Sequence, residues 1–246
     1  MMNLILDFGN TCKKLAVVSA RKTVFFTTQS HIDIDDIVAA GEKYEIKNAI
    51  LSSVVNDSQT IENYLADKYT FVKLSDKTPL PIKNVYRTKH TLGSDRIACA
   101  VAAQDCFPRE NVLVLQLGTC ITSDFITDEG VYMGGSISPG MEMRFKALHH
   151  FSGKLPLVEH QNIDYITGQS SEESILSGVI HGIIAECNYL IANYKSKYPY
   201  LKVIVTGGNL KAFENAIKGE ITPFPNLVIS GLDLILCYNV AKDESN

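Results

Sequence analysis

Residues 112–119 read VLVLQLGT, and residues 3–11 read NLILDFGNT. Aligned on their glycines, both stretches run along an apolar strand, through one polar and one apolar residue, into a glycine turn. The polar residue is Asp7 in the first copy and Gln116 in the second. A strand that enters a glycine turn at two places in one chain indicates an internal duplication, in which one copy carries a carboxylate and the other a neutral amide.

A strand hairpin is expected after each of the two turns. Apolar strands that end in glycine turns are common, so the similarity of the turns alone can arise by chance. The matching hairpins favour a duplication, with one half at 1–108 and the other at 109–246. The expected hairpin strands are 14–20 and 23–29 in the first half, and 120–127 and 131–137 in the second.

Helical and strand patterns alternate along the rest of the chain, which predicts the α/β class. Residues 74–92 are polar, contain prolines and lack a clear period, so we expect a connecting loop there. The long helix expected at 170–198 has Ser170 or Ser171 as its N-cap. The other expected helices are 33–44, 59–69, 93–107, 140–151 and 210–217, and the other expected strands are 4–8, 48–55, 70–74 and 203–209.

The composition is that of an ordinary globular protein. The chain has 246 residues, of which 46% are hydrophobic and 20% charged, enough for a substantial core in one large or two ordinary domains. The net charge of −4 gives no general electrostatic case for binding nucleic acid. The N-terminus has no basic segment, so we expect no secretory signal, and no apolar run reaches the length that spans a membrane.

The six cysteines include no C-x-x-C pair, which disfavours a zinc site. Without a secretory signal, we interpret them as reduced thiols, some of them buried as small apolar groups. We therefore expect a cytoplasmic protein with no membrane partner.

Glycine turns that follow strands can hold phosphate groups. Glycine lets the backbone come close to an anion, and successive N–H groups can form an anion-binding nest. Thr11 and Thr119 add hydroxyl donors to the two turns, and Asp7 can hold a cation or its water shell. A third glycine turn, Gly207-Gly208, follows another expected strand. The three turns resemble those of the sugar kinase, Hsp70 and actin superfamily, which implies two ribonuclease H-like domains and an interdomain cleft that closes on ATP.

Further motifs narrow the resemblance to one family. TLGSDRIACAVAA at 91–103 places Gly-Ser-Asp-Arg at the start of an alanine-rich helix, and GGSISPG at 134–140 is followed downstream by Leu-Pro. With LDFGNTCKKLAVV, SSVVND, GTCITSDFI and TGGN, these motifs run in the family's order along nearly the whole chain and resemble a type III pantothenate kinase. The related accessory factors for transcription share the same fold and motifs.

The resemblance implies roles for individual residues. Asp95 matches the family's proton acceptor within its pantothenate-binding G-x-D-R motif. Ser171 stands where the family usually has a pantothenate-contacting threonine, so the hydroxyl is kept and a methyl is lost. The implied pantothenate-binding residues are Tyr86, Gly93, Ser94, Asp95, Arg96 and Ser171. The implied ATP-binding residues are Asp7, Phe8, Gly9, Asn10, Thr11, Cys12, Lys13, Lys14, Thr119, Gly207 and Gly208.

The chemistry of phosphoryl transfer suits these residues, because transfer needs mainly positioning and charge neutralisation. The Asp95 carboxylate can accept the proton of the pantothenate hydroxyl, and the Arg96 guanidinium can hold the pantothenate carboxylate through two parallel hydrogen bonds. From spacing alone, the alternative is a helix N-terminal aspartate paired with a surface arginine. Lys13 and Lys14 are adjacent on a strand and point to opposite faces, so at most one of them faces the phosphates.

The sequence departs from the family pattern at Gln116. The family normally carries an aspartate there, tied to the potassium or ammonium ion that these enzymes need. An amide oxygen can coordinate potassium, but it brings no charge and attracts Mg²⁺ less strongly. We hypothesise that Asp124, further along the same segment, supplies part of the missing charge. The resemblance also implies Mg²⁺ with the ATP, and Asp7 would act on this ion through the phosphates.

Two functions from different classes fit these features. The first is ATP-dependent phosphorylation of pantothenate to 4′-phosphopantothenate, which opens coenzyme A synthesis. The second is a catalytically impaired homologue that acts as an accessory or regulatory binding protein, although Asp7, Asp95, Arg96 and Thr119 are all retained. A kinase of another small acid or of a sugar is a third interpretation, and the arginine argues against a sugar because it prefers a carboxylate. The family is usually dimeric, which implies a homodimer with the pantothenate site near the subunit interface.

Overall fold

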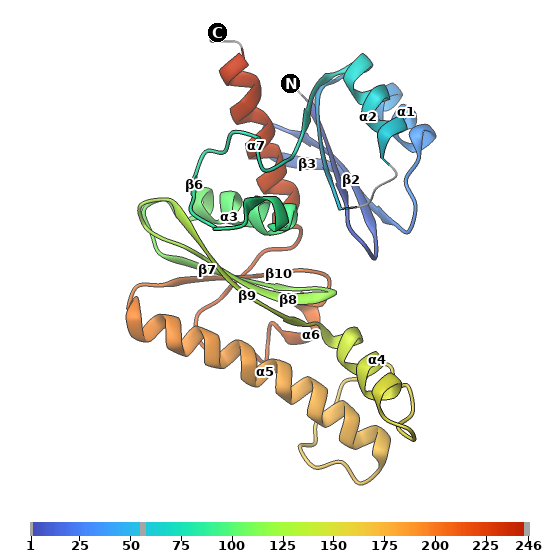
Figure 1. Ribbon diagram of the computed structural model, residues 1–246, viewed down its shortest axis with the longest axis vertical. Helices are drawn as coiled ribbons and strands as arrows, with labels where there is room; N and C mark the ends of the chain where they lie inside the picture. The colour runs from blue at the N-terminus through green and yellow to red at the C-terminus, as the bar shows by residue number, and fades with distance from the viewer. Residues whose placement is uncertain (1, 55–57, 244–246) are drawn as a thin grey trace. The chain divides into compact units, whose positions relative to one another are not determined.

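The computed structural model describes residues 2–54 and 58–243 (Figure 1). Residues 55–57, at the end of the SSVVND motif, lie outside the described residues. The chain divides into two compact units. The first takes in the described residues of 1–106, 130–132 and 226–246, and the second takes in 107–129 and 133–225. The last helix of the chain therefore folds with the N-terminal strands.

The first unit contains a mixed sheet of five strands. In chain order these are β1 (Met2–Phe8), β2 (Lys13–Ser19), β3 (Lys22–Gln29), β4 (Ile46–Ser53) and β5 (Thr70–Lys73). They lie in the order β3-β2-β1-β4-β5. The first three strands form an antiparallel meander, whereas β4 is parallel to both β1 and β5.

The second unit repeats this arrangement. Its strands are β7 (Val112–Leu117), β8 (Cys120–Ile126), β9 (Val131–Pro139), β10 (Lys202–Thr206) and β11 (Thr222–Pro223). They lie in the order β9-β8-β7-β10-β11, with β7 antiparallel to β8 and parallel to β10. Because β7 holds the place in its sheet that β1 holds in the first, the duplication expected from the two glycine turns is confirmed in the topology.

Helices cover both faces of the first sheet. They are α1 (Ile34–Lys43), α2 (Gln59–Lys68), α3 (Ser94–Cys106) and α7 (Leu227–Asp243). Leu4, Leu6 and Phe8 of β1 share a buried core with Ile37 of α1 and Leu65 of α2. The intervening residues of β1 point to the other face, where α7 packs on β1 and β4 and also on α3. A Cβ at position 231 would lie 1.8 Å from the carbonyl oxygen of residue 98, so a glycine there lets α3 and α7 approach this closely.

The second sheet is covered by one long helix. The helices of this unit are α4 (Met141–Phe151), α5 (Ser171–Lys197) and α6 (Leu210–Phe213). Ser170 is the N-cap of α5, because its side chain accepts a hydrogen bond from the Glu173 N–H. By length and composition α5 is apolar enough to cross a membrane, so the expectation that no segment of the chain reaches that length is corrected. Its apolar side chains, from Ile175 to Ile191, pack into the core against β7 and β8, as in a core helix of a folded domain.

Most of the expected helices and strands are confirmed, and the differences have local causes. The helix expected at 210–217 ends at Phe213, and a turn follows it in which the N–H groups of Ala216 and Ile217 both donate to the Phe213 carbonyl oxygen. The loop expected at 74–92 contains the strand β6 (Lys83–Asn84), which pairs with the start of β9, and the 3-10 helix η1 (Lys89–Thr91). Both pieces are too short for sequence periodicity to reveal.

Candidate active site

The first turn, residues 9–12, joins β1 to β2 within the first unit. The Gly9 N–H donates to the Cys12 carbonyl oxygen at 3.1 Å and closes the turn around Asn10 and Thr11, which are exposed. A Cβ at position 9 would lie 3.2 Å from the same carbonyl oxygen, so glycine relieves a tight contact. The turn has the short, glycine-dependent form that lets a backbone approach an anion.

Asp7 lies just before this turn, 6% exposed, with Lys14 on β2 and Ser52 on β4 as its register partners. The Lys14 Nζ lies 3.0 Å from the Asp7 Oδ2. Burial by itself would lower the pKa of Lys14, but the charge of Asp7 and the hydrogen bond to it outweigh burial and raise that pKa above its ordinary value. Lys13 points to the opposite face, with its Nζ 4.8 Å from the Phe8 ring centroid. Lys14 is therefore the lysine of this pair that brings its charge to Asp7.

The G-S-D-R motif begins α3 beside the end of β4. The Ser52 hydroxyl donates to Asp7 Oδ1 at 3.2 Å, and the Ser94 Oγ lies 2.8 Å from the Ser52 Oγ. A Cβ on Gly93 would lie 2.6 Å from Asp95 Oδ1, so glycine leaves room for the Asp95 carboxylate against the chain. The structure thus connects the helix start that carries Asp95 to the strand end that carries Asp7.

Arg96 and Tyr86 lie together in the first unit. Arg96 is 4% exposed, so the alternative of a surface arginine is wrong. Its Cζ lies 5.7 Å from the Tyr86 ring centroid, within the range of a cation–π interaction. The Tyr86 ring lies 6.2 Å from the Tyr132 ring, and the Tyr86 N–H donates to Asn84 Oδ1 at 2.9 Å. The aromatic ring and the guanidinium expected at one substrate site are therefore neighbours.

The second turn, residues 118–120, joins β7 to β8 in the second unit. The Gly118 N–H donates to the Cys120 carbonyl oxygen at 3.0 Å, as Gly9 does to Cys12 in the first turn. The Gly140 N–H, just before α4, donates to the Thr119 carbonyl oxygen at 3.0 Å. A Cβ at position 140 would lie 2.1 Å from the carbonyl oxygen of Gly118, so the GGSISPG motif ends in the glycine that lets α4 start against this turn.

The third turn, residues 207–209, follows β10 and packs on the end of β7. Gly207 has a φ of +102°, and a Cβ there would lie 2.4 Å from the Leu117 carbonyl oxygen. The Asn209 N–H donates to that same oxygen at 2.9 Å. Gly208, in contrast, has space around it, with nothing within 4 Å of an added Cβ. Gly207 is therefore required by the fold of the turn, whereas the space beside Gly208 is open.

Gln116 holds in the second sheet the place that Asp7 holds in the first. Its register partners are Thr122 on β8 and Thr206 on β10, and register partners lie on the same face of a sheet. Asp124 lies two residues beyond Thr122, on that face, and is fully buried. It accepts a hydrogen bond from the Thr122 hydroxyl at 3.1 Å. A buried carboxylate therefore lies on the Gln116 face, although not at the position where the family pattern has it.

Sequence reasoning missed the residues that flank the two central strand ends. Ser52, Thr122 and Thr206 lie beside Asp7 or Gln116 only through strand pairing, so a knowledge of strand register is the signal that finds them. Ser171 is the first residue of α5 and is exposed. By residue number, the expected site residues from Asp7 to Arg96 belong to the first unit, and those from Gln116 to Gly208 belong to the second.

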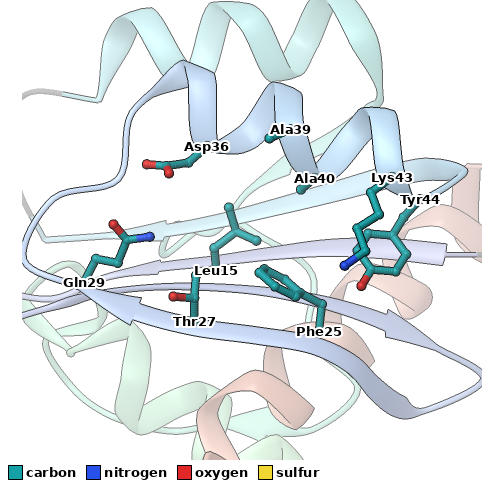
Figure 2. A pocket seen from close by; sticks show the side chains of 9 residues that line it. All are labelled: Leu15, Phe25, Thr27, Gln29, Asp36, Ala39, Ala40, Lys43 and Tyr44. Carbon is teal, nitrogen blue, oxygen red and sulfur yellow. The ribbon is translucent and has the colours of Figure 1, made fainter.

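A pocket of about 210 Å³ lies in the first unit between α1 and the strands β2 and β3 (Figure 2). Its walls include Leu15, Phe25 and Tyr44, and the Lys43 Nζ lies 5.7 Å from the Phe25 ring centroid. The residues expected to bind ATP or pantothenate are not among those that line it. We interpret it as a gap in the packing of α1 on the sheet.

Comparison with known proteins places this chain among kinases. The family model for type III pantothenate kinase matches residues 3–193. A type III pantothenate kinase from Christiangramia forsetii is 42% identical over 243 residues, covering 97% of this chain and 99% of that protein. One from Phocaeicola vulgatus is 41% identical over 239 residues and covers 97% and 99%. One from Cytophaga hutchinsonii is 42% identical over 239 residues and covers 97% and 100%.

Solved structures share the fold. A protein from Campylobacter jejuni, described as a Baf family transcriptional activator, has a TM-score of 0.62 at 22% identity and covers 97% of this chain and 99% of its own. A ROK family glucokinase from Streptomyces griseus, in complex with glucose and AMPPNP, has a TM-score of 0.51 at 12% identity and covers 95% and 99%. At these identities the two structures support the duplicated ribonuclease H-like fold alone.

Proposed function

This chain belongs to the type III pantothenate kinase family, and on that premise we propose a role for each part of its site. The protein is a kinase that transfers phosphate from ATP to pantothenate in coenzyme A biosynthesis. The observation that carries the residue roles is the row formed by half-buried Lys14 with buried Asp7 and Ser52. This row joins the first turn to the helix start that bears Asp95.

Asp95 is the proton acceptor for the pantothenate hydroxyl. It stands in the first turn of α3, next to Gly93, whose missing side chain leaves room for the carboxylate. As the hydroxyl oxygen attacks the γ-phosphorus, the bond from that phosphorus to the bridging oxygen breaks and ADP leaves, while the hydroxyl proton passes to a carboxylate oxygen within hydrogen-bond reach. Such a general base contributes about 100- to 10,000-fold to a rate.

Arg96 binds the pantothenate carboxylate, and Tyr86 packs against the Arg96 guanidinium and the bound pantothenate. A guanidinium presents two parallel N–H donors, which match the two oxygens of a carboxylate. The aromatic face of Tyr86 beside Arg96 holds the guanidinium plane in place. Gly93, Ser94 and Ser171 complete the substrate-binding set, with Ser171 as a hydroxyl donor at the start of α5.

The first, second and third turns each contact the nucleotide. Residues Asp7 to Lys14 include the backbone N–H groups and the Lys14 ammonium that suit phosphate oxygens. Thr119 offers a hydroxyl and an N–H group in the second turn. Gly207 and Gly208 form the third turn, where the space beside Gly208 suits the adenosine.

A potassium or ammonium ion binds beside Gln116. Hard cations prefer oxygen ligands, and the face that carries Gln116 also carries Thr122 and the buried Asp124 carboxylate. The neutral amide at position 116 fits this face, because a second carboxylate near Asp124 would add like-charge repulsion. Mg²⁺ accompanies the ATP phosphates, and Asp7 acts on it through them. Among residues 2–54 and 58–243, no group of three or more His, Cys, Asp or Glu residues forms a separate metal cluster.

The protein acts as a cytoplasmic homodimer, without a nucleic-acid or membrane partner. In the second unit, β9 exposes Ile137, which is 61% exposed, and α4 ends with Phe151, which is 86% exposed. A second subunit would cover large apolar side chains that are exposed to this extent. Size-exclusion chromatography with light scattering tests the dimer, and a monomer at micromolar concentration would contradict it.

A coupled ADP-release assay with ATP, Mg²⁺, potassium and pantothenate tests the activity and the role of Asp95 together. The wild type is expected to release ADP only when pantothenate is present. Asp95→Asn keeps the size of the side chain and removes the proton acceptor, so we expect a fall in kcat of about 100-fold or more. Turnover by Asp95→Asn at the wild-type rate would reject that role, and an inactive wild type would reject the kinase function.

A further inference from the structure

We propose that Ser52 is a positioning residue for phosphoryl transfer, because it joins Asp7 at the first turn to Ser94 at the start of α3. The proposal rests on the proposed function, since it takes Asp95, the neighbour of Ser94, as the proton acceptor. Ser52 belongs to the SSVVND segment, and its two side-chain partners lie 45 residues before it and 42 residues after it.

The direction of the two hydrogen bonds follows from the number of protons. The Asp7 carboxylate is paired with the Lys14 ammonium and has only acceptor oxygens, so the Ser52 hydroxyl donates its single proton to Asp7 Oδ1 at 3.2 Å. The 2.8 Å contact between the two serines must then use a lone pair of Ser52 and the proton of Ser94. The chain of donors therefore runs in one direction, from Ser94 through Ser52 to Asp7.

This direction fixes the orientation of the first residue of α3. The Ser94 proton points toward Ser52, so the side chain of Ser94 is held toward the sheet and leaves lone pairs for donors on its other side. Ser94 is followed directly by Asp95, so a rotation at the helix start moves the carboxylate of the proton acceptor. A displacement of about 1 Å in a reacting group can cost about 100-fold in rate.

Burial makes the link costly to break. Ser52 is 1% exposed, and Asp7 is buried at the end of the neighbouring strand. If the Ser52 hydroxyl is removed, the part-buried Ser94 donor loses its acceptor, and Asp7 Oδ1 loses a donor in a place where water has little access. Asp7 is also held by Lys14, so the first turn stays anchored to β2 and the expected loss falls mainly on the α3 side.

The test compares Ser52→Ala, Ser94→Ala and the double variant in the ADP-release assay, at a temperature where circular dichroism shows every variant folded. We expect each single variant to lower kcat by about 10-fold, with a smaller change in the KM for ATP, because the loss concerns positioning. The kcat of the double variant should be at most about twofold lower than that of the worse single variant, because both substitutions break the same series of hydrogen bonds. Ser52→Thr keeps the hydroxyl and should restore at least half of the lost kcat.

Ser58→Ala is the matched control. Ser58 is also a buried serine of the first unit, and its hydroxyl donates to a carboxylate oxygen of Glu62 at 2.5 Å. This variant should lose stability and keep the wild-type kcat, which separates positioning from a general loss of folding. The proposal is overturned if Ser52→Ala keeps kcat within about twofold of the wild type, or if the two single losses multiply in the double variant.

An inactive wild type would reject the kinase function but would leave the link itself testable. The same three variants are therefore also unfolded with urea, which needs no turnover. Non-additive changes in stability between Ser52→Ala and Ser94→Ala support the link, and additive changes reject it.

Discussion

The Lys14 ammonium lies 3.0 Å from the Asp7 carboxylate, across two antiparallel strands. In the second unit, the same pair of strand positions holds Gln116 and Thr122, which are both neutral. The carboxylate of the first copy is therefore balanced by a cation on the next strand, and the amide of the second copy needs none. The change from Asp7 to Gln116 therefore accompanies the change from Lys14 to Thr122 on the neighbouring strand.

Asp7→Asn should destabilise the protein. The substitution leaves the largely buried Lys14 ammonium without its counter-ion, and breaking such a pair costs about 2 kcal/mol when one partner keeps some contact with water. Urea unfolding at pH 7 measures the loss. Asp7→Asn combined with Lys14→Met also removes the ammonium, keeps an acceptor oxygen for the Ser52 hydroxyl, and should regain most of the lost stability, because no charge is then buried alone. If the double variant is no more stable than Asp7→Asn, the pair does not govern stability at this position.

Gln116→Asp should change the response to potassium. The new carboxylate shares a face with buried Asp124, so the repulsion lowers the thermal midpoint in choline chloride, and a bound potassium ion relieves that repulsion. We expect the midpoint to rise more steeply with KCl than in the wild type, and half-maximal activity to need less KCl. Gln116→Leu, which has no oxygen, should need more. If Gln116→Asp changes neither the potassium dependence nor the rate, Gln116 is not at the cation site.

The sequence predicted the three turns because each depends on local chemistry. A side chain at Gly9 or Gly207 would come within 3.2 or 2.4 Å of a backbone oxygen, and a glycine after an apolar strand is visible in the sequence itself. The residues beside Asp7 and Gln116 depend instead on which strands pair and in which register. Ser52 lies 45 residues from Asp7, and no local sequence pattern links residues that are so far apart. The place of α7 in the first unit was likewise hidden, because its apolar sequence does not say which sheet it covers.

Arg96→Lys should weaken the recognition of the pantothenate carboxylate. Lysine keeps the charge but loses the planar pair of donors and the guanidinium contact with the Tyr86 ring, so the KM for pantothenate should rise about 10-fold or more. The alcohol analogue of pantothenate, which lacks the carboxylate, should be used about equally by the wild type and the variant. Steady-state kinetics with both substrates give the ratio of their kcat/KM values. An unchanged ratio would place the carboxylate away from Arg96.

Asp233→Asn should make the protein more stable at neutral pH. Burial raises the pKa of Asp233 on α7, although the hydrogen bond from Asn3 Nδ2, at 2.7 Å, favours the charged form. The folded protein therefore binds this proton more tightly than the unfolded chain, so stability falls as the pH rises from the unfolded pKa through the native pKa. Asparagine keeps the acceptor oxygen for Asn3 and has no proton to lose. Urea unfolding between pH 4 and pH 8, a window set by the ordinary carboxyl pKa of about 4, should show a flatter profile for the variant. An equal slope in both proteins would contradict this role of Asp233.

Gly207→Ala and Gly208→Ala form a matched pair at the third turn. An alanine at 207 would have to adopt a φ of +102° and would place its Cβ 2.4 Å from the Leu117 carbonyl oxygen, which belongs to the backbone of a buried strand. Strain and clash together should cost about 3 kcal/mol or more in urea unfolding. An alanine at 208 meets nothing within 4 Å, so its cost should stay within about 1 kcal/mol.

The same pair of variants should also differ in ATP binding. Because the Asn209 N–H also donates to the Leu117 oxygen, Gly207→Ala should displace the whole turn and weaken ATP binding in calorimetry. Equal losses of stability in the two variants would show that the turn is not built on the close contact between Gly207 and Leu117.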